Sequence, residues 1–121
     1  EEVPFGTDLI FAAGNLAGFT FGVEICEDFW APNPPGTMAA LAGALIVCNL
    51  SASPVTIGRA DDRHLHCRAS ASRGICAYAY SASGHGESTT DLAWDGQGVI
   101  YEMSDLVAQS ARFDLTPELC I

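Results

Sequence analysis

The chain has 121 residues, of which 49% are hydrophobic, and it carries a formal net charge of −10 at pH 7. A chain of this length accommodates one small domain, so no second domain is expected. All five basic residues are arginines against 15 acidic residues, which argues against a surface that binds nucleic acid or an anionic membrane.

Two β-strands are predicted near the start of the chain, because residues 8–12 and 19–26 are rich in apolar, β-branched and aromatic side chains. The proline-rich segment 27–36 predicts irregular structure, since proline disrupts both helices and central strands. A short helix of small residues is predicted over residues 38–44, with Thr37 as its N-cap. Its alanines and glycine suit close packing on a sheet.

The second part of the chain again alternates strands and a helix. Residues 45–50 (LIVCNL) form an almost unbroken apolar run, which predicts a strand covered on both faces. A helix over residues 59–73 that ends at Gly74 leads to a further strand over residues 75–82. A polar, glycine-rich loop, a short strand over residues 99–102 and an irregular tail follow.

The predicted element order is β-β-α-β-α-β-β. Strands that alternate with helices indicate an α/β domain with an at least partly parallel sheet. The apolar content of so short a chain also predicts a face that packs against another protein surface. Residues 1–7 have no initiator methionine and read as the interior of a longer reading frame, so we expect a fragment.

The cysteines indicate the cellular compartment. There are five, an odd number, and Cys26, Cys48 and Cys76 lie in apolar stretches. Free cysteines of this kind are typical of the reducing cytoplasm rather than of a disulfide framework. The longest apolar run, residues 38–48, is too short to cross a bilayer. We therefore expect a cytoplasmic protein that does not enter a membrane.

Cys26 is the candidate nucleophile, because it ends a predicted strand and precedes a loop. Reactive groups of α/β sheets gather at the carboxyl ends of strands, and an elbow there exposes the sulfur and aims the next backbone N–H at an oxyanion. Position alone favours the alternative, a buried cysteine that packs as a small hydrophobe. The flanking acids Glu24, Glu27 and Asp28 oppose thiolate formation, so a nucleophile here needs a base and a cation.

The bases that this chain itself offers are histidines. Arginine remains protonated, so a Cys–His couple would have to use His64, His66 or His85. His64 and Cys67 are spaced to share a helix face, but no second ligand pair with zinc-like spacing follows, which argues against a metal site. The chain contains no lysine, so its glycine-rich loop is not a phosphate-binding loop of the GxxxxGK[ST] type.

The segment Gly22–Trp30 (GVEICEDFW) resembles the nucleophile motif of the nitrilase, or carbon–nitrogen hydrolase, superfamily. Its CEDFW form is similar to the glutaminase domain of glutamine-dependent NAD synthetases, as are residues 44–53 and 81–97. The resemblance implies an αββα sandwich and a Glu–Lys–Cys triad in which Cys26 is the nucleophile. The Glu and Lys lie upstream in that family, so residues 1–121 resemble only the C-terminal half of such a domain.

The resemblance also implies residues that bind glutamine. Arg59 would bind the α-carboxylate bidentately, assisted by Ser53 from the same loop. The alternative for Arg59 is a surface ion pair with Asp61 or Asp62, which would contribute little to stability.

Three residues next to the cysteine are further candidates. Glu27 would place its backbone N–H at the oxyanion and its carboxylate at the α-ammonium group, the alternative being a solvated or helix-capping acid. Phe29 and Trp30 would line the pocket, although aromatic side chains beside a proline-rich loop more often serve in packing.

The resemblance further implies the reaction and the partners. The parent chain would hydrolyse glutamine through a cysteine thioester and pass ammonia to the ATP-dependent amidation of deamido-NAD. ATP, Mg²⁺ and deamido-NAD are expected in the missing synthetase domain, with no cofactor or metal here, and homo-oligomers are expected. A free-standing amidase acting on another amide and a non-catalytic assembly fragment remain as alternatives. Alone, the chain lacks the base and the lysine, so we expect it to be inactive.

Overall fold

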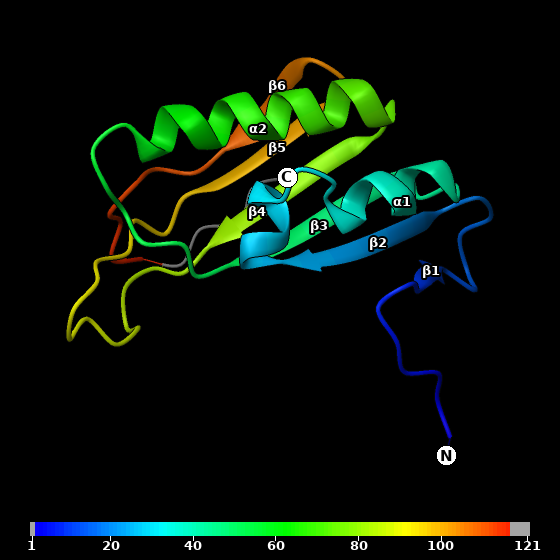
Figure 1. Ribbon diagram of the computed structural model, residues 1–121, viewed down its shortest axis with the longest axis horizontal. Coiled ribbons are helices and arrows are strands. Elements are labelled where there is room, and N and C mark those ends of the chain that lie inside the picture. Colours follow the sequence, from blue (N-terminus) through cyan, green and yellow to red (C-terminus); the bar gives the residue numbers. More distant parts are fainter. Residues whose placement is uncertain (1, 117–121) are drawn as a thin grey trace.

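The computed structural model describes residues 2–116 and places two α-helices on one mixed β-sheet (Figure 1). Six strands lie in the order β1-β2-β3-β4-β5-β6 within the described residues. They are β1 (Ile10–Ala12), β2 (Thr20–Ile25), β3 (Ile46–Ser51), β4 (Ala77–Ala82), β5 (Gly98–Glu102) and β6 (Asp105–Gln109). The helices are a 3₁₀ turn, η1 (Cys26–Trp30), and α1 (Pro35–Leu41) and α2 (Arg59–Gly74).

The sheet has a parallel centre and antiparallel edges. Strands β2, β3 and β4 are parallel, while β1, β5 and β6 pair antiparallel to their neighbours. Helices α1 and α2 make the two crossovers that parallel neighbours require. The predicted α/β class and the partly parallel sheet are therefore confirmed. In the part of the chain that the structure describes, neither helix is long and apolar enough to span a bilayer.

Strand β6 was not predicted. The tail was expected to be irregular, yet Asp105–Gln109 pairs with β5 after a register shift between Ile100 and Tyr101. Four of its five residues are exposed, so the strand lacks the alternation of buried and exposed residues from which a strand is predicted. The last part of the predicted tail, residues 117–121, lies outside the described residues.

The proline-rich segment is more ordered than predicted. Its first residues form η1, and α1 begins at Pro35 rather than at Met38. Thr37 is therefore not the N-cap. Pro35 occupies a first-turn position, where the missing N–H has no helical partner to lose and the fixed φ suits a helix. The second proline of the pair thus starts the helix instead of preventing it.

The core lies between the sheet and its helices. Helix α1 approaches β2 closely, because a Cβ at Gly22 would lie 2.6 Å from the Cβ of Ala39. This agrees with the close packing expected of a small-residue helix. The buried core is formed by Phe29, Val47, Cys67, Ala71, Cys76, Tyr78, Tyr80, Val99 and Tyr101. The prediction that Tyr78 and Tyr80 share a strand face and pack in the core is confirmed.

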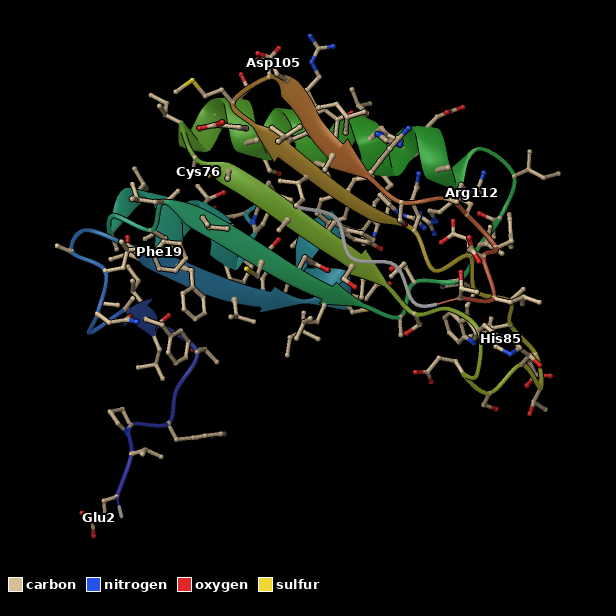
Figure 2. All side chains as sticks on the ribbon, turned by 180° about the vertical axis from the view of Figure 1, so that it is seen from behind. Glu2, Phe19, Cys76, His85, Asp105 and Arg112 are labelled. Carbon is tan, nitrogen blue, oxygen red and sulfur yellow. The ribbon has the colours of Figure 1, made fainter. Side chains whose placement is uncertain are left out.

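The opposite face of the sheet carries no helix (Figure 2). Residues that alternate with the buried ones point there, and Ile25 and Leu50 are 61% and 59% exposed. The expectation that residues 45–50 are covered on both faces does not hold within the described residues. The helix-free face of the sheet is instead apolar and exposed, and it is the candidate for the face that was expected to pack against another protein surface.

Candidate functional site

Cys26 lies at a sharp elbow between β2 and η1. The strand ends at Ile25, one residue earlier than predicted, and Cys26 has a φ of 51°, in the left-handed region. Asp28 folds back across the elbow, since the Ile25 N–H donates a 2.9 Å hydrogen bond to its Oδ2. A cysteine at positive φ is uncommon, and such backbone strain concentrates at functional sites. The expected strand-to-loop elbow is therefore present.

The thiol of Cys26 faces the end of the neighbouring strand. Parallel pairing sets Ile25 opposite Leu50, so the residues that follow both strands meet. The Cys26 Sγ lies 3.8 Å from the Oγ of Ser53, and this is its one hydrogen-bond contact with a described residue. Ser53 Oγ also lies 3.0 Å from Ser51 Oγ and accepts a 3.4 Å hydrogen bond from Trp30 Nε1. The thiol thus adjoins a small hydroxyl cluster.

Arg59 reaches the same cluster from the first turn of α2. Its guanidinium carbon lies 4.4 Å from the centroid of the Trp30 ring, in a cation–π contact. It forms no ion pair with any described residue, so the surface pairs considered with Asp61 and Asp62 are not made. Its Nε is buried without a hydrogen-bond partner among residues 2–116. The guanidinium therefore has free donors for an anion.

The remaining candidate residues differ in burial: one is exposed to solvent and one lies in the core. Glu27 is exposed on η1. Phe29 is only 2% exposed and packs edge-on to Trp30 at 5.1 Å. The structure thus brings together Cys26, Ser53 and Trp30 with Arg59, while Phe29 lies in the core beneath them, in the packing role that the sequence also offered.

The histidines do not contact the thiol. His66 packs edge-on against Phe29 and Trp30, and His64 lies 2.8 Å, through Nδ1, from the hydroxyl of Tyr101. Burial and the neighbouring Arg63 guanidinium lower the pKa of His64. A Cys–His couple is not formed among the described residues. The same part of the chain contains no group of three His, Cys, Asp or Glu side chains that could hold a metal ion.

Glu24 was expected to oppose the Cys26 thiolate, whereas Arg63 and Asp95 were given no role from the sequence. Glu24 turns into the core, where its carboxylate accepts hydrogen bonds from the Gly36 N–H (2.6 Å) and the Tyr78 hydroxyl. Arg63, one helical turn after Arg59, pairs with Asp95 at 2.9 Å. The four-residue spacing places Arg63 on the same helix face as Arg59, which could have identified Arg63 from the sequence. Nothing local signals Asp95, which lies 32 residues away.

No family model matches the chain. The glutamine-dependent NAD(+) synthetase of Mycobacterium tuberculosis is 59% identical to it over 112 residues, which make up 93% of this chain and 16% of that protein. The chain therefore spans about 16% of the length of this relative.

Two solved structures share the fold. The glutamine-dependent NAD+ synthetase from Acinetobacter baumannii, in complex with adenosine diphosphate, matches with a TM-score of 0.75 and 25% identity over 88% of this chain and 19% of that chain. Nit3 from Saccharomyces cerevisiae, a member of branch 10 of the nitrilase superfamily, matches with a TM-score of 0.73 over 93% of this chain and 40% of that chain. At 18% identity, the second match establishes the fold alone.

Proposed function

We propose that this chain, which is homologous to a segment of the glutamine-dependent NAD(+) synthetases and has a nitrilase-superfamily fold, carries the nucleophile of a glutamine-hydrolysing domain. One observation carries the proposal: Cys26 is held at positive φ at the carboxyl end of a central strand. A buried structural cysteine needs no such backbone, whereas a nucleophile must present its sulfur to a substrate.

The proposed reaction has two steps. The Cys26 sulfur attacks the amide carbon of glutamine, a C–S bond forms, and the C–N bond breaks as ammonia leaves with the proton that the thiol gave up. Water then attacks the thioester, releasing glutamate and restoring the thiol. The proton acceptor and the lysine of the triad would come from the rest of the parent chain. The ammonia would serve the ATP- and Mg²⁺-dependent amidation of deamido-NAD there.

The other site residues would bind the amino-acid end of glutamine. The free donors of Arg59 beside Trp30 support a role in binding the α-carboxylate. Ser53 would add a hydroxyl from the position it holds 3.8 Å from the thiol. The exposed carboxylate of Glu27 would pair with the α-ammonium group, and its N–H would face the oxyanion.

The parent protein would supply the remaining partners. The helix-free face of the sheet, with Ile25 and Leu50 exposed, is suited to pack against the rest of the parent chain. The described cysteines are all free, in keeping with the reducing cytoplasm as the location. Assembly into a homo-oligomer remains part of the proposal. The 59% identity to an NAD synthetase disfavours a free-standing amidase.

The decisive experiment compares the two nitrogen sources of the parent enzyme. Cys26→Ala should abolish glutamine-dependent NAD synthesis and leave ammonia-dependent synthesis intact. Cys48→Ala, which alters a half-buried cysteine on β3, is the matched control and should change neither. A glutamine analogue with an electrophilic diazoketone should label Cys26 and spare Cys48. Equal loss of both activities in Cys26→Ala would instead indicate a structural or assembly role.

A further inference from the structure

Arg59 and Arg63 lie one turn apart on the same face of α2, but the fold holds them differently. Arg63 is fully buried, and its Nη1 donates hydrogen bonds to Asp95 Oδ2 at 2.9 Å and to Gln97 Oε1 at 2.6 Å. Arg59 has no ion pair with a described residue. Its Nε is buried without a hydrogen-bond partner among residues 2–116, as are Nε and Nη2 of Arg63, so the ion pair is what distinguishes the two guanidinium groups. One guanidinium is anchored, and the next along the helix is available to a ligand.

The anchor depends on a single carboxylate. A buried guanidinium is stable only beside an anion, and Asp95 is the one acidic residue that pairs with Arg63 in the range 2–116. Asp95 is itself 2% exposed, and the Gln97 N–H donates to its Oδ1 at 3.2 Å just before β5 begins. The pair therefore attaches the first turns of α2 to the start of β5.

A series of tilted and edge-on aromatic contacts connects the two arginines by a second route. The Arg63 guanidinium carbon lies 5.1 Å from the centroid of the Tyr80 ring, and Tyr80 lies 5.3 Å from Phe29. Phe29 contacts Trp30 at 5.1 Å, and Trp30 underlies Arg59 at 4.4 Å. This series of contacts begins and ends on the same helix, so a shift of α2 at Arg63 would also separate Arg59 from Trp30.

The start of α2 is held by backbone hydrogen bonds, among them one from the Arg59 N–H to the Thr56 carbonyl at 3.1 Å, and not by a side-chain cap. Its N-cap residue is Gly58, at a φ of 80°, and no side chain caps the helix there. The side-chain hydrogen bond that usually anchors a helix N-terminus is missing. The ion pair and the aromatic contacts therefore supply side-chain interactions that a capping residue would otherwise give to the first turns, and they bear on the location of the Arg59 guanidinium.

We propose that Asp95 is a positioning residue for substrate binding: through Arg63 it sets the place of the Arg59 guanidinium over Trp30, whose indole N–H reaches the Ser53 hydroxyl next to Cys26. This inference rests on the proposed role of Arg59 in binding the α-carboxylate of an amino-acid substrate. Asp95 does not touch the substrate. Its loss affects binding of the carboxylate, which does not change during the reaction, so the effect falls on KM rather than on kcat.

The test is a double-mutant cycle in the parent enzyme. Asp95→Asn keeps the shape of the side chain and removes its charge, and it should raise the KM for glutamine about tenfold while kcat changes less than twofold. In an Arg59→Ala background the same substitution should have no further effect on KM. Asp95→Glu should restore part of the affinity. Ammonia-dependent synthesis should be unchanged throughout.

Arg112→Gln is the matched control. It removes the other cation from Asp95, the 3.1 Å partner whose side chain is 35% exposed, and it should leave the glutamine KM within about twofold of the original value. Should Asp95→Asn fail to fold, Gln97→Met removes the second acceptor of Arg63 and should give a smaller KM rise that likewise vanishes without Arg59.

Two outcomes would overturn the positioning role: an unchanged KM in folded Asp95→Asn, or a KM rise of equal size with and without Arg59. A different result tests the proposed function itself. If Arg59→Ala leaves the KM for glutamine unchanged, or Cys26→Ala still hydrolyses glutamine, the proposed function fails, and the positioning role fails with it.

Discussion

The Tyr78 hydroxyl donates a hydrogen bond to the carboxylate of Glu24, 54 residues earlier in the chain and two strands away in the sheet. Burial and the adjacent Glu24 carboxylate raise the pKa of Tyr78, so the phenol stays protonated and acts as the donor. The same carboxylate accepts the N–H of Gly36 in the first turn of α1. Glu24 thus joins β2, β4 and α1 directly below the elbow that carries Cys26.

Tyr78→Phe should therefore destabilise the protein by about 1–3 kcal/mol, because a buried carboxylate loses a donor. Tyr80→Phe is the matched control, since Tyr80 lies on the same strand and face and its buried hydroxyl has no partner among the described residues. Removing that hydroxyl should be neutral or slightly stabilising. Chemical denaturation of the three proteins measures the difference, and equal losses for both variants would contradict this account.

His64 should make stability depend on pH. Gln97 Oε1 accepts a hydrogen bond from Arg63, so the amide nitrogen of Gln97 is the atom that lies 3.2 Å from His64 Nε2. If His64 Nε2 were protonated, two hydrogen-bond donors would oppose each other at this contact. The pKa of His64 is lowered from 6.5 by burial and by Arg63 and Arg112, which outweigh Asp61. The unfolded state therefore binds the proton first, and stability falls as the pH drops below about 6.5 toward the folded-state pKa.

The measurement is the thermal unfolding midpoint at pH values from about 7.5 down to about 5, which bracket the ordinary histidine pKa of about 6.5. His64→Gln should flatten the slope in this range. His85→Gln, in the exposed loop, should leave the slope as it is. Identical slopes in His64→Gln and the unaltered protein would refute the assignment.

The isolated chain should self-associate through the helix-free sheet face. Ile25 and Leu50 leave apolar surface in water, which favours association between copies. Light scattering at micromolar concentration should detect oligomers or aggregates, and Leu50→Glu should reduce them. Ile57→Glu, at a fully exposed loop position, is the control. A clean monomer would count against this prediction.

The isolated chain should also fail to hydrolyse glutamine at a useful rate. In the proposed mechanism the Glu and Lys of the triad come from the rest of the parent chain. Members of a catalytic triad act as a unit, so the absence of two typically lowers the rate by several orders of magnitude. Ammonia release by the purified chain, with Cys26→Ala as the control, measures the residual rate. Activity near that of an ordinary amidase and dependent on Cys26 would mean that a residue of this chain serves as the base.

Sequence reasoning succeeded where a pattern was local. The period-2 run around Tyr78 and Tyr80 and the helix that ends at Gly74 were both predicted from neighbouring residues. Strand β6 was missed because an exposed edge strand has no buried alternation. The strand at residues 45–50 was expected to be buried on both faces, but one face is exposed. An apolar sequence does not show whether a face is buried by its own chain or by another protein surface.

The same distinction between local and tertiary information holds for the candidate site. Cys26 was named from its position at a strand end and from a resemblance, and Ser53 and Arg59 were named from the resemblance; the fold brings them into one cluster. The stacking of Arg59 on Trp30 and the pairing of Arg63 with Asp95 join residues 29 and 32 positions apart. Such contacts follow from the tertiary path of the chain, and no local spacing in the sequence encodes them.

The left-handed backbone of Cys26 also bears on how this segment would evolve if its chemistry were no longer needed. A β-carbon at a φ of 51° costs about 1–2 kcal/mol, a cost that glycine avoids. Cys26→Gly should therefore remove the thiol and relieve the local strain together. Selection for the proposed reaction would keep cysteine at this position, whereas selection for stability alone would favour glycine. We expect a homologous domain with glycine at this position and an otherwise intact sheet to have lost the proposed nucleophile. Such a domain would retain only a structural role in an assembly.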